Sequence, residues 1–141
     1  MALEFDRSII GSEYDHTVHP PVAAERIREY AAAAGETNPR YTTADDAELI
    51  ASPTFVVSLR GQHFWPRNMP NFGRSGFDAG KDIEFGAPVR AGDVLTSTST
   101  VHDIYEKTGR SGSMVFIILR TLVTNQRGEL VATIDQKMMV R

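Results

Sequence analysis

Hydrophobic and polar positions divide the chain into a helical first part and a strand-rich second part. Between Val22 and Ala34, apolar residues recur at spacings of three and four, with charged residues between them. This is the period of an amphipathic helix. Pro20 and Pro21 precede the segment, and Gly35 follows it as a typical C-terminal glycine. The pattern therefore predicts a helix over residues 22–34.

Three further features of the first half are predicted from pattern. A strand is expected near residues 10–18. A short helical turn is expected from about Thr43, where a capping threonine precedes acidic residues. Residues 54–65 follow Pro53 and are apolar on most sides, so this segment fits either a helix or a strand.

From Lys81 onward the pattern predicts four strands, over residues 81–85, 93–107, 113–124 and 130–140. The second is rich in threonine and alternates, and the middle of the third is apolar enough to be buried on both faces. Turn-forming residues at 90–93, 108–112 and 125–129 are typical of antiparallel hairpins. The expected fold class is α+β, with a long antiparallel meander and helices packed on one face.

Composition narrows the classes of protein to consider. The 141 residues suit one domain over 1–141, and 41% are hydrophobic while 23% are charged. A net charge of −3 argues against a nucleic-acid partner. No apolar run approaches the ~18 residues that span a bilayer, and the acidic N-terminal segment lacks the features of a signal peptide. We expect a cytoplasmic protein without membrane or nucleic-acid partners.

Four segments spread over most of the chain resemble blocks of one protein group. Residues 35–41, GETNPRY, resemble the R-hydratase signature Gly-Asp-x-Asn-Pro-x-His. Residues 51–55, ASPTF, resemble the segment that starts the central helix in MaoC-type dehydratases. Residues 85–93 and 105–112 resemble two further blocks, F-x-x-P-V-R-A-G-D and Y-E-K-x-G-R-S-G. The chain thus resembles the N-terminal, FAS1-type dehydratase-like domain of the MaoC-like (R)-specific hydratase/dehydratase superfamily.

This resemblance implies a hot-dog fold, in which a long curved antiparallel sheet wraps around a central helix. It also implies an (R)-specific enoyl-thioester hydratase or 3-hydroxyacyl-thioester dehydratase. The substrate carrier would be CoA or an acyl-carrier protein, with no other cofactor. A curved sheet leaves a long edge strand exposed, so we expect a dimer. The partner is either a second copy or a second MaoC-like hot-dog subunit that bears the Asp/His pair.

The signature departs from the family at its two catalytic positions. The family's Asp and His deprotonate the water that adds to an enoyl thioester, whereas this chain carries Glu36 and Tyr41. The longer glutamate moves its carboxylate by about one bond length, and a misplacement of ~1 Å can cost ~10²-fold in rate. A phenol with a reference pKa of about 10 is a poor base at neutral pH. We expect the chain alone to be weak or inactive and to serve as the acyl-chain-binding half.

The residues expected to contact substrate lie mostly around the resemblance blocks. Ordinary structural alternatives exist: a helix stop followed by an Asn-Pro turn for the segment that holds Asn38, core packing for the apolar side chains, and solvation for the arginine. For His63, packing beside aromatic neighbours is the favoured alternative to a base. No histidine shows metal-ligand spacing, so no metal is expected. The set is Asn38, Pro53, Thr54, Phe55, Leu59, His63, Trp65 and Arg90.

Two other functions remain open from the sequence. One is a homodimeric, non-catalytic protein that binds acyl thioesters. The other is a hot-dog thioesterase in which a carboxylate such as Glu36 activates water. Thioesterases of this fold do not usually show the Asn-Pro turn, which disfavours the second. Residues 68–80 are expected to form a mobile flap or a loop at the dimer contact.

Overall fold

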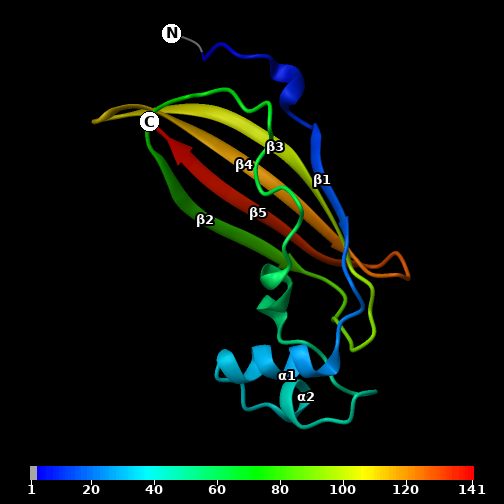
Figure 1. The fold of residues 1–141 in the computed structure, drawn as a ribbon. Coiled ribbons are helices and arrows are strands. Elements are labelled where there is room, and N and C mark those ends of the chain that lie inside the picture. Colours follow the sequence, from blue (N-terminus) through cyan, green and yellow to red (C-terminus); the bar gives the residue numbers. More distant parts are fainter. Residues whose placement is uncertain (1–2) are drawn as a thin grey trace.

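The computed structural model describes residues 3–141 and is built on one five-stranded antiparallel sheet of order β1-β3-β4-β5-β2 (Figure 1). The sheet curves along its length, and the longest helix lies beyond one end of it. The strands are β1 Glu13–Val18, β2 Gly76–Phe85, β3 Thr96–Gly109, β4 Gly112–Thr124 and β5 Leu130–Val140. The helices are η1 Arg7–Ile9, α1 Ala24–Ala33, α2 Pro39–Thr42 and η2 Pro53–Ser58, of which η1 and η2 are 3-10 helices.

The α+β class and most predicted elements are confirmed. The helix α1 ends as the glycine predicted: Gly35 adopts φ +74°, its N–H bonds to the carbonyl of Ala32, and the N–H of Glu36 bonds to that of Ala31. This is a Schellman motif, which satisfies carbonyls at a helix end. The last predicted strand has the bounds of β5. Within residues 3–141, no helix is long and apolar enough to cross a membrane.

The strand at 81–85 was predicted too short and with the wrong neighbour. It begins at Gly76, inside the predicted flap, and pairs with β5 instead of forming a hairpin with β3. Side-chain partners decide this register, because Ile83 lies opposite Ile134 on β5. The turn at 90–93 therefore connects an edge strand to a strand on the far side of the sheet. The prediction that each strand pairs with the next one along the chain is therefore wrong for β2.

The short second helix starts earlier than predicted. It spans Pro39–Thr42, whereas the residues from Thr43 onward form only a turn. Asn38 precedes the helix, and its side chain accepts a hydrogen bond from the N–H of Arg40 at 3.1 Å. Proline at the first helical position needs no partner for a missing N–H. The Asn-Pro pair therefore begins a helix here, whereas the sequence analysis considered it as a turn.

The segment over residues 54–65 forms neither a long helix nor a strand. It begins with η2 and continues as an irregular chain that crosses the sheet, as Figure 1 shows. Adjacent β-branched Val56 and Val57 disfavour a helix slightly, and Pro66 disfavours helical geometry in the residue before it. The N–H groups of Gln62 and His63 instead bond to side chains of β1. The hot-dog sheet is therefore covered by a short 3-10 helix and a loop.

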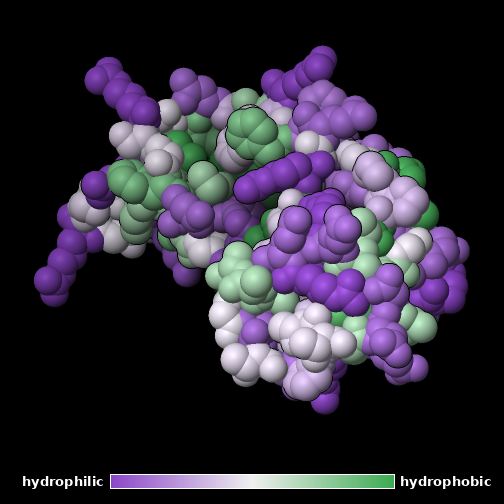
Figure 2. All heavy atoms as spheres, turned by 60° about the horizontal axis from the view of Figure 1, so that its bottom comes forward, coloured by the Kyte–Doolittle hydropathy of each residue, from purple (hydrophilic) through white to green (hydrophobic). Residues whose placement is uncertain are grey.

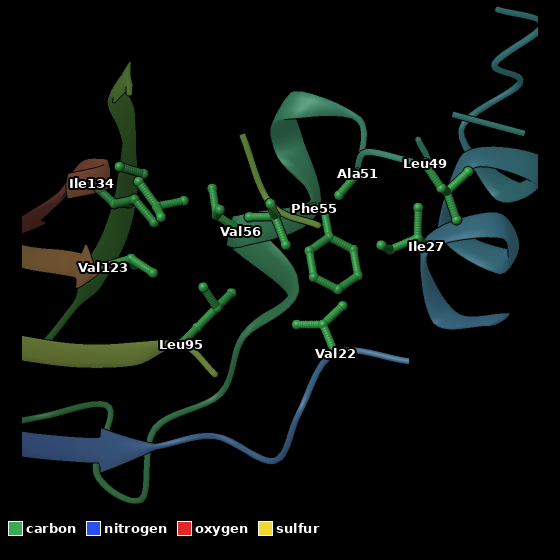
Figure 3. Close-up of a cluster of buried hydrophobic side chains, with 12 residues drawn as sticks. Val22, Ile27, Leu49, Ala51, Phe55, Val56, Leu95, Val123 and Ile134 are labelled. Atoms are coloured by element: carbon green, nitrogen blue, oxygen red, sulfur yellow. The ribbon is translucent and has the colours of Figure 1, made fainter. Parts of the chain in front are cut away.

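The core forms around η2, which joins the helices to the sheet. Figure 3 shows Phe55 directed toward α1 and Val22, while Val56 faces the ends of the strands. Phe55 is 1% exposed, and its ring packs edge-on against Tyr30 with centroids 5.6 Å apart. A second buried cluster lies farther along the sheet and includes Ile117. We call the sheet face that carries both clusters the inner face. Seen from the α1 side, hydrophilic side chains make up most of the surface (Figure 2).

Candidate functional site

The signature loop is fixed at both ends by helix caps. The Schellman bonds of α1 hold Glu36, which is half-buried, and the cap at Asn38 fixes the start of α2. Tyr41 lies within α2 and is also half-buried. The predicted catalytic positions are thus held by ordinary helix-end geometry. Asn38 uses its side-chain oxygen for capping, and this is a structural role.

Tyr41 lines a cavity of about 130 Å³, which we call the signature cavity. Its other walls are mostly apolar and include Pro53, Val56 and the edge-strand residue Phe85. Ser52 also lines it, and within residues 3–141 the buried Ser52 hydroxyl has no hydrogen-bond partner. Glu36 is not part of this lining in the described chain. The structure therefore brings Tyr41, but not Glu36, to the wall of the cavity.

A larger cavity of about 350 Å³ lies between the inner face and the segment after η2; we call it the inner-face cavity. Its floor is apolar and includes Leu119, Val123 and Ile134. Leu59 and His63, both predicted to contact substrate, line it from the covering segment. Besides His63, the polar residues of its wall are Tyr14, Arg60, Lys81, Ser97, Ser99, Thr121 and Gln136.

His63 is held by a buried carboxylate. The side chain of Asp15 on β1 is 2% exposed, and its Oδ1 accepts the backbone N–H of His63 at 2.9 Å. The same oxygen lies 3.4 Å from Nδ1 of the imidazole. Burial alone would raise the pKa of Asp15, but hydrogen bonds from Thr17, His63 and Gln62 outweigh it and lower the pKa. Asp15 is therefore an anion that fixes the position of His63.

A third cavity, of about 450 Å³, opens farther along the inner face; we call it the distal cavity. Trp65, Met69, Ile117, Met138 and Val140 are among its walls. The inner-face cavity and the distal cavity share one row of side chains, because Leu119 and Ile117 are two residues apart on β4 and point to the same face. Each cavity therefore has an apolar β4 side chain in its wall.

Three further residues predicted to contact substrate, Phe55, Thr54 and Arg90, make contacts within the chain. Phe55 is fully buried in the core cluster. Thr54 is exposed and accepts a hydrogen bond from the Tyr30 hydroxyl at 2.8 Å. Arg90 is exposed, forms an isolated bridge with Ile50, and donates its backbone N–H to Asp93. Of the eight predicted contacts, Pro53, Leu59, His63 and Trp65 line cavities.

Asp15 is the functional candidate that the sequence analysis missed. It lies 48 residues before His63, and pattern alone cannot pair a strand residue with a loop so distant in the chain. One local signal exists, since Asp15 is an acidic residue between tyrosine and histidine in a strand. Acidic side chains are rarely buried without partners, so burial of this one requires donors nearby.

Comparison with known families now decides the assignment. Residues 8–134 match the model of the FAS1-like dehydratase domain region. The chain belongs to this family. A relative in Streptomyces coelicolor, a UPF0336 protein, is 34% identical over 99% of this chain and 97% of its own length. The family resemblance inferred from the sequence blocks is therefore confirmed.

Solved structures show the same fold. The C-terminally truncated HadBC complex of Mycobacterium tuberculosis, a 3R-hydroxyacyl-ACP dehydratase, contains a chain 25% identical with a TM-score of 0.69, covering 97% of this chain and 99% of that one. A MaoC-like dehydratase from Phytophthora capsici is 20% identical with a TM-score of 0.74, covering 99% of this chain but 50% of that one. The hot-dog fold of this FAS1-like dehydratase family member is thus shown.

Proposed function

We propose that this chain is the acyl-chain-binding subunit of an (R)-specific enoyl-thioester hydratase or 3-hydroxyacyl-thioester dehydratase, completed by a hot-dog partner with an intact Asp/His pair. The observation that carries the proposal is the signature cavity, which is lined by Tyr41, the residue that occupies the histidine position of the signature in the sequence. A phenol does not exchange protons readily near neutral pH, whereas imidazole does. The chain keeps the family fold but lacks the family's proton-handling pair.

The inner-face and distal cavities support a role in holding an acyl chain. Their volumes of about 350 and 450 Å³ fall in the range of small-molecule sites, and apolar side chains form much of both. A thioester entering from the β2 side would pass Lys81 and Gln136 before reaching Ile117 and Met138. Burial of each methylene contributes about 0.8 kcal/mol, so a medium-length chain would bind measurably.

The edge strand β2 supports the partner. All but one of its ten residues are exposed, and Phe77 and Phe85 are 43% and 52% exposed. An unpaired strand edge of this length is a template for pairing with another chain. Phe85 also lines the signature cavity, so a subunit added at this edge would lie beside Tyr41. The partner's catalytic residues would then act close to the position that this chain has lost.

Binding and turnover by the purified chain test the proposal. The single tryptophan, Trp65, lines the distal cavity and serves as a fluorescence reporter. We expect saturable quenching by octanoyl-CoA, together with negligible hydration of octenoyl-CoA. Addition of a hot-dog partner bearing Gly-Asp-x-Asn-Pro-x-His is expected to restore hydration. Absence of acyl-CoA binding contradicts the proposal, and so does substantial turnover by the chain alone that Glu36→Gln abolishes.

Co-purification separates this function from a homodimeric acyl-thioester-binding protein. The exposed β2 edge suits either a second copy or a different hot-dog subunit. Recovery of the tagged chain from its native cell with a signature-bearing hot-dog protein supports the hydratase subunit. Recovery as a homodimer that binds octanoyl-CoA supports the binding protein.

A further inference from the structure

The Asp15–His63 contact lies outside the signature and fixes one ring orientation. Asp15 Oδ1 binds the backbone N–H of His63 and faces its Nδ1, while Oδ2 accepts the Thr17 hydroxyl at 2.8 Å. Gly61 completes the arrangement, because a Cβ at that position would overlap the Asp15 carboxylate. Both oxygens of the carboxylate are therefore engaged, and the imidazole has a defined partner at Nδ1.

The two neighbours of the ring require the same tautomer. A carboxylate only accepts hydrogen bonds, so the proton of neutral His63 belongs on Nδ1, facing Asp15. A guanidinium only donates, and Nη2 of Arg67 lies 3.3 Å from Nε2. Nε2 therefore carries the lone pair. Nε2 of His63 is therefore a hydrogen-bond acceptor, while its Nδ1–H faces Asp15.

This acceptor belongs to a residue in the wall of a cavity whose floor is apolar and whose other walls carry polar side chains. His63 lines the inner-face cavity above Leu119 and Ile134, and its side chain is 41% exposed. The contact with Arg67 is long and solvent-exposed, so a ligand donor replaces it at little cost. A ligand that combines an apolar chain with one hydroxyl group fits this environment.

We propose that Nε2 of His63 accepts the hydrogen bond of the 3-hydroxyl group of a 3-hydroxyacyl thioester, which makes His63 a specificity-determining residue. Saturated and enoyl thioesters carry no donor at C3 and cannot form this bond. The chain then prefers the hydrated member of the substrate pair. One neutral hydrogen bond corresponds to a preference of about 3- to 10-fold in Kd. The inference rests on the proposed function, in that the cavities hold an acyl thioester.

The test compares three CoA thioesters of equal chain length by titration against the fluorescence of Trp65. We expect (R)-3-hydroxyoctanoyl-CoA to bind about 3- to 10-fold more tightly than octanoyl-CoA. We expect 3-methoxyoctanoyl-CoA, which keeps the oxygen but has no donor, to lose this advantage. The variant His63→Phe should remove the preference, so that its Kd values for (R)-3-hydroxyoctanoyl-CoA and octanoyl-CoA agree within about twofold. The matched control His102→Phe, at an exposed position on β3, should keep the preference.

The outcomes separate the inference from the function on which it rests. If none of the three thioesters binds, the proposed function fails. If all bind with equal affinity, only the role of His63 fails. A preference that survives in His63→Phe, or that the methoxy analogue retains, also overturns the assignment. The comparison of ligands on the unchanged protein keeps the test decisive even if the variant does not fold.

Discussion

Gly61 shows how one residue without a side chain positions another. Its Cα lies so close to the Asp15 carboxylate that a methyl group has no room. We predict that Gly61→Ala lowers the free energy of unfolding by about 1–3 kcal/mol, because either the loop or β1 must move. Urea denaturation measures this. Gly76→Ala is the matched control, since a Cβ there meets no atom within 4 Å, and it should stay within about 0.5 kcal/mol of the parent.

The carboxylate of Asp15 gives the fold a defined response to acid. Its pKa lies below the ordinary value of 3.8, so the folded state binds this proton less readily than the unfolded state. The stabilisation is present above pH 3.8 and is lost as the pH falls through the lowered pKa. We predict that Asp15→Asn lowers Tm at neutral pH and that its deficit shrinks on acidification. A constant difference in Tm from neutral to acidic pH contradicts this assignment.

At the residue scale, the sequence predicted local motifs better than contacts between residues far apart in the chain. The Gly-Glu-x-Asn-Pro segment and the replaced catalytic positions were readable, because they are local patterns. For Phe55 the sequence left both a substrate contact and core packing open, and the side chain is 1% exposed in the core. The pairing of Asp15 with His63 was not predictable, because a strand and a loop meet only once the sheet forms. Long-range polar contacts of this kind leave no periodic signal.

The 3-10 helix η2 is the element that joins the helices to the sheet. Because Phe55 is 1% exposed, we predict that Phe55→Ala costs about 3–5 kcal/mol in unfolding free energy. Phe64 lies on the same covering segment but is 89% exposed, so Phe64→Ala is the matched control and should cost less than about 0.5 kcal/mol. Equal losses for the two variants in urea denaturation are incompatible with this role for η2.

The edge strand β2 is the element proposed to pair with a second subunit. We predict that Phe85→Asp shifts the assembly toward monomer, because the charge would be buried at the joined edge. Light scattering after size-exclusion chromatography measures the mass. Leu122→Asp is the matched control: Leu122 is also exposed, at 41%, but it lies on β4 inside the sheet. If neither variant or both variants change the mass, β2 is not the interface.

Helices and strands with a clear hydrophobic periodicity were predicted well. The order of the strands in the sheet was predicted less well. The amphipathic helix and the strand at 130–140 follow from side-chain spacing alone. The position of β2 beside β5 does not, because strand order depends on long-range packing between residues such as Ile83 and Ile134. The covering segment after η2 was ambiguous for a physical reason: apolar residues without a clear period fit several conformations until β1 supplies hydrogen-bond partners.

At the scale of the whole molecule, the proposed function assigns acyl-chain binding and proton transfer to two different subunits. This chain contributes a curved sheet with apolar cavities on its inner face, and the proposed partner contributes the proton-handling pair. In such a pair, the cavities of one hot-dog domain can change while the catalytic geometry of the other stays the same.

Steady-state hydration of octenoyl-CoA, followed by loss of enoyl absorbance, is the most direct test of that division. We expect no measurable rate for the purified chain and a clear rate once a signature-bearing hot-dog subunit is added. We also expect Glu36→Gln and Tyr41→Phe in this chain to leave the rate of the assembled enzyme nearly unchanged. A substantial rate for this chain alone, lost on Glu36→Gln, would show instead that this chain carries the catalytic residues.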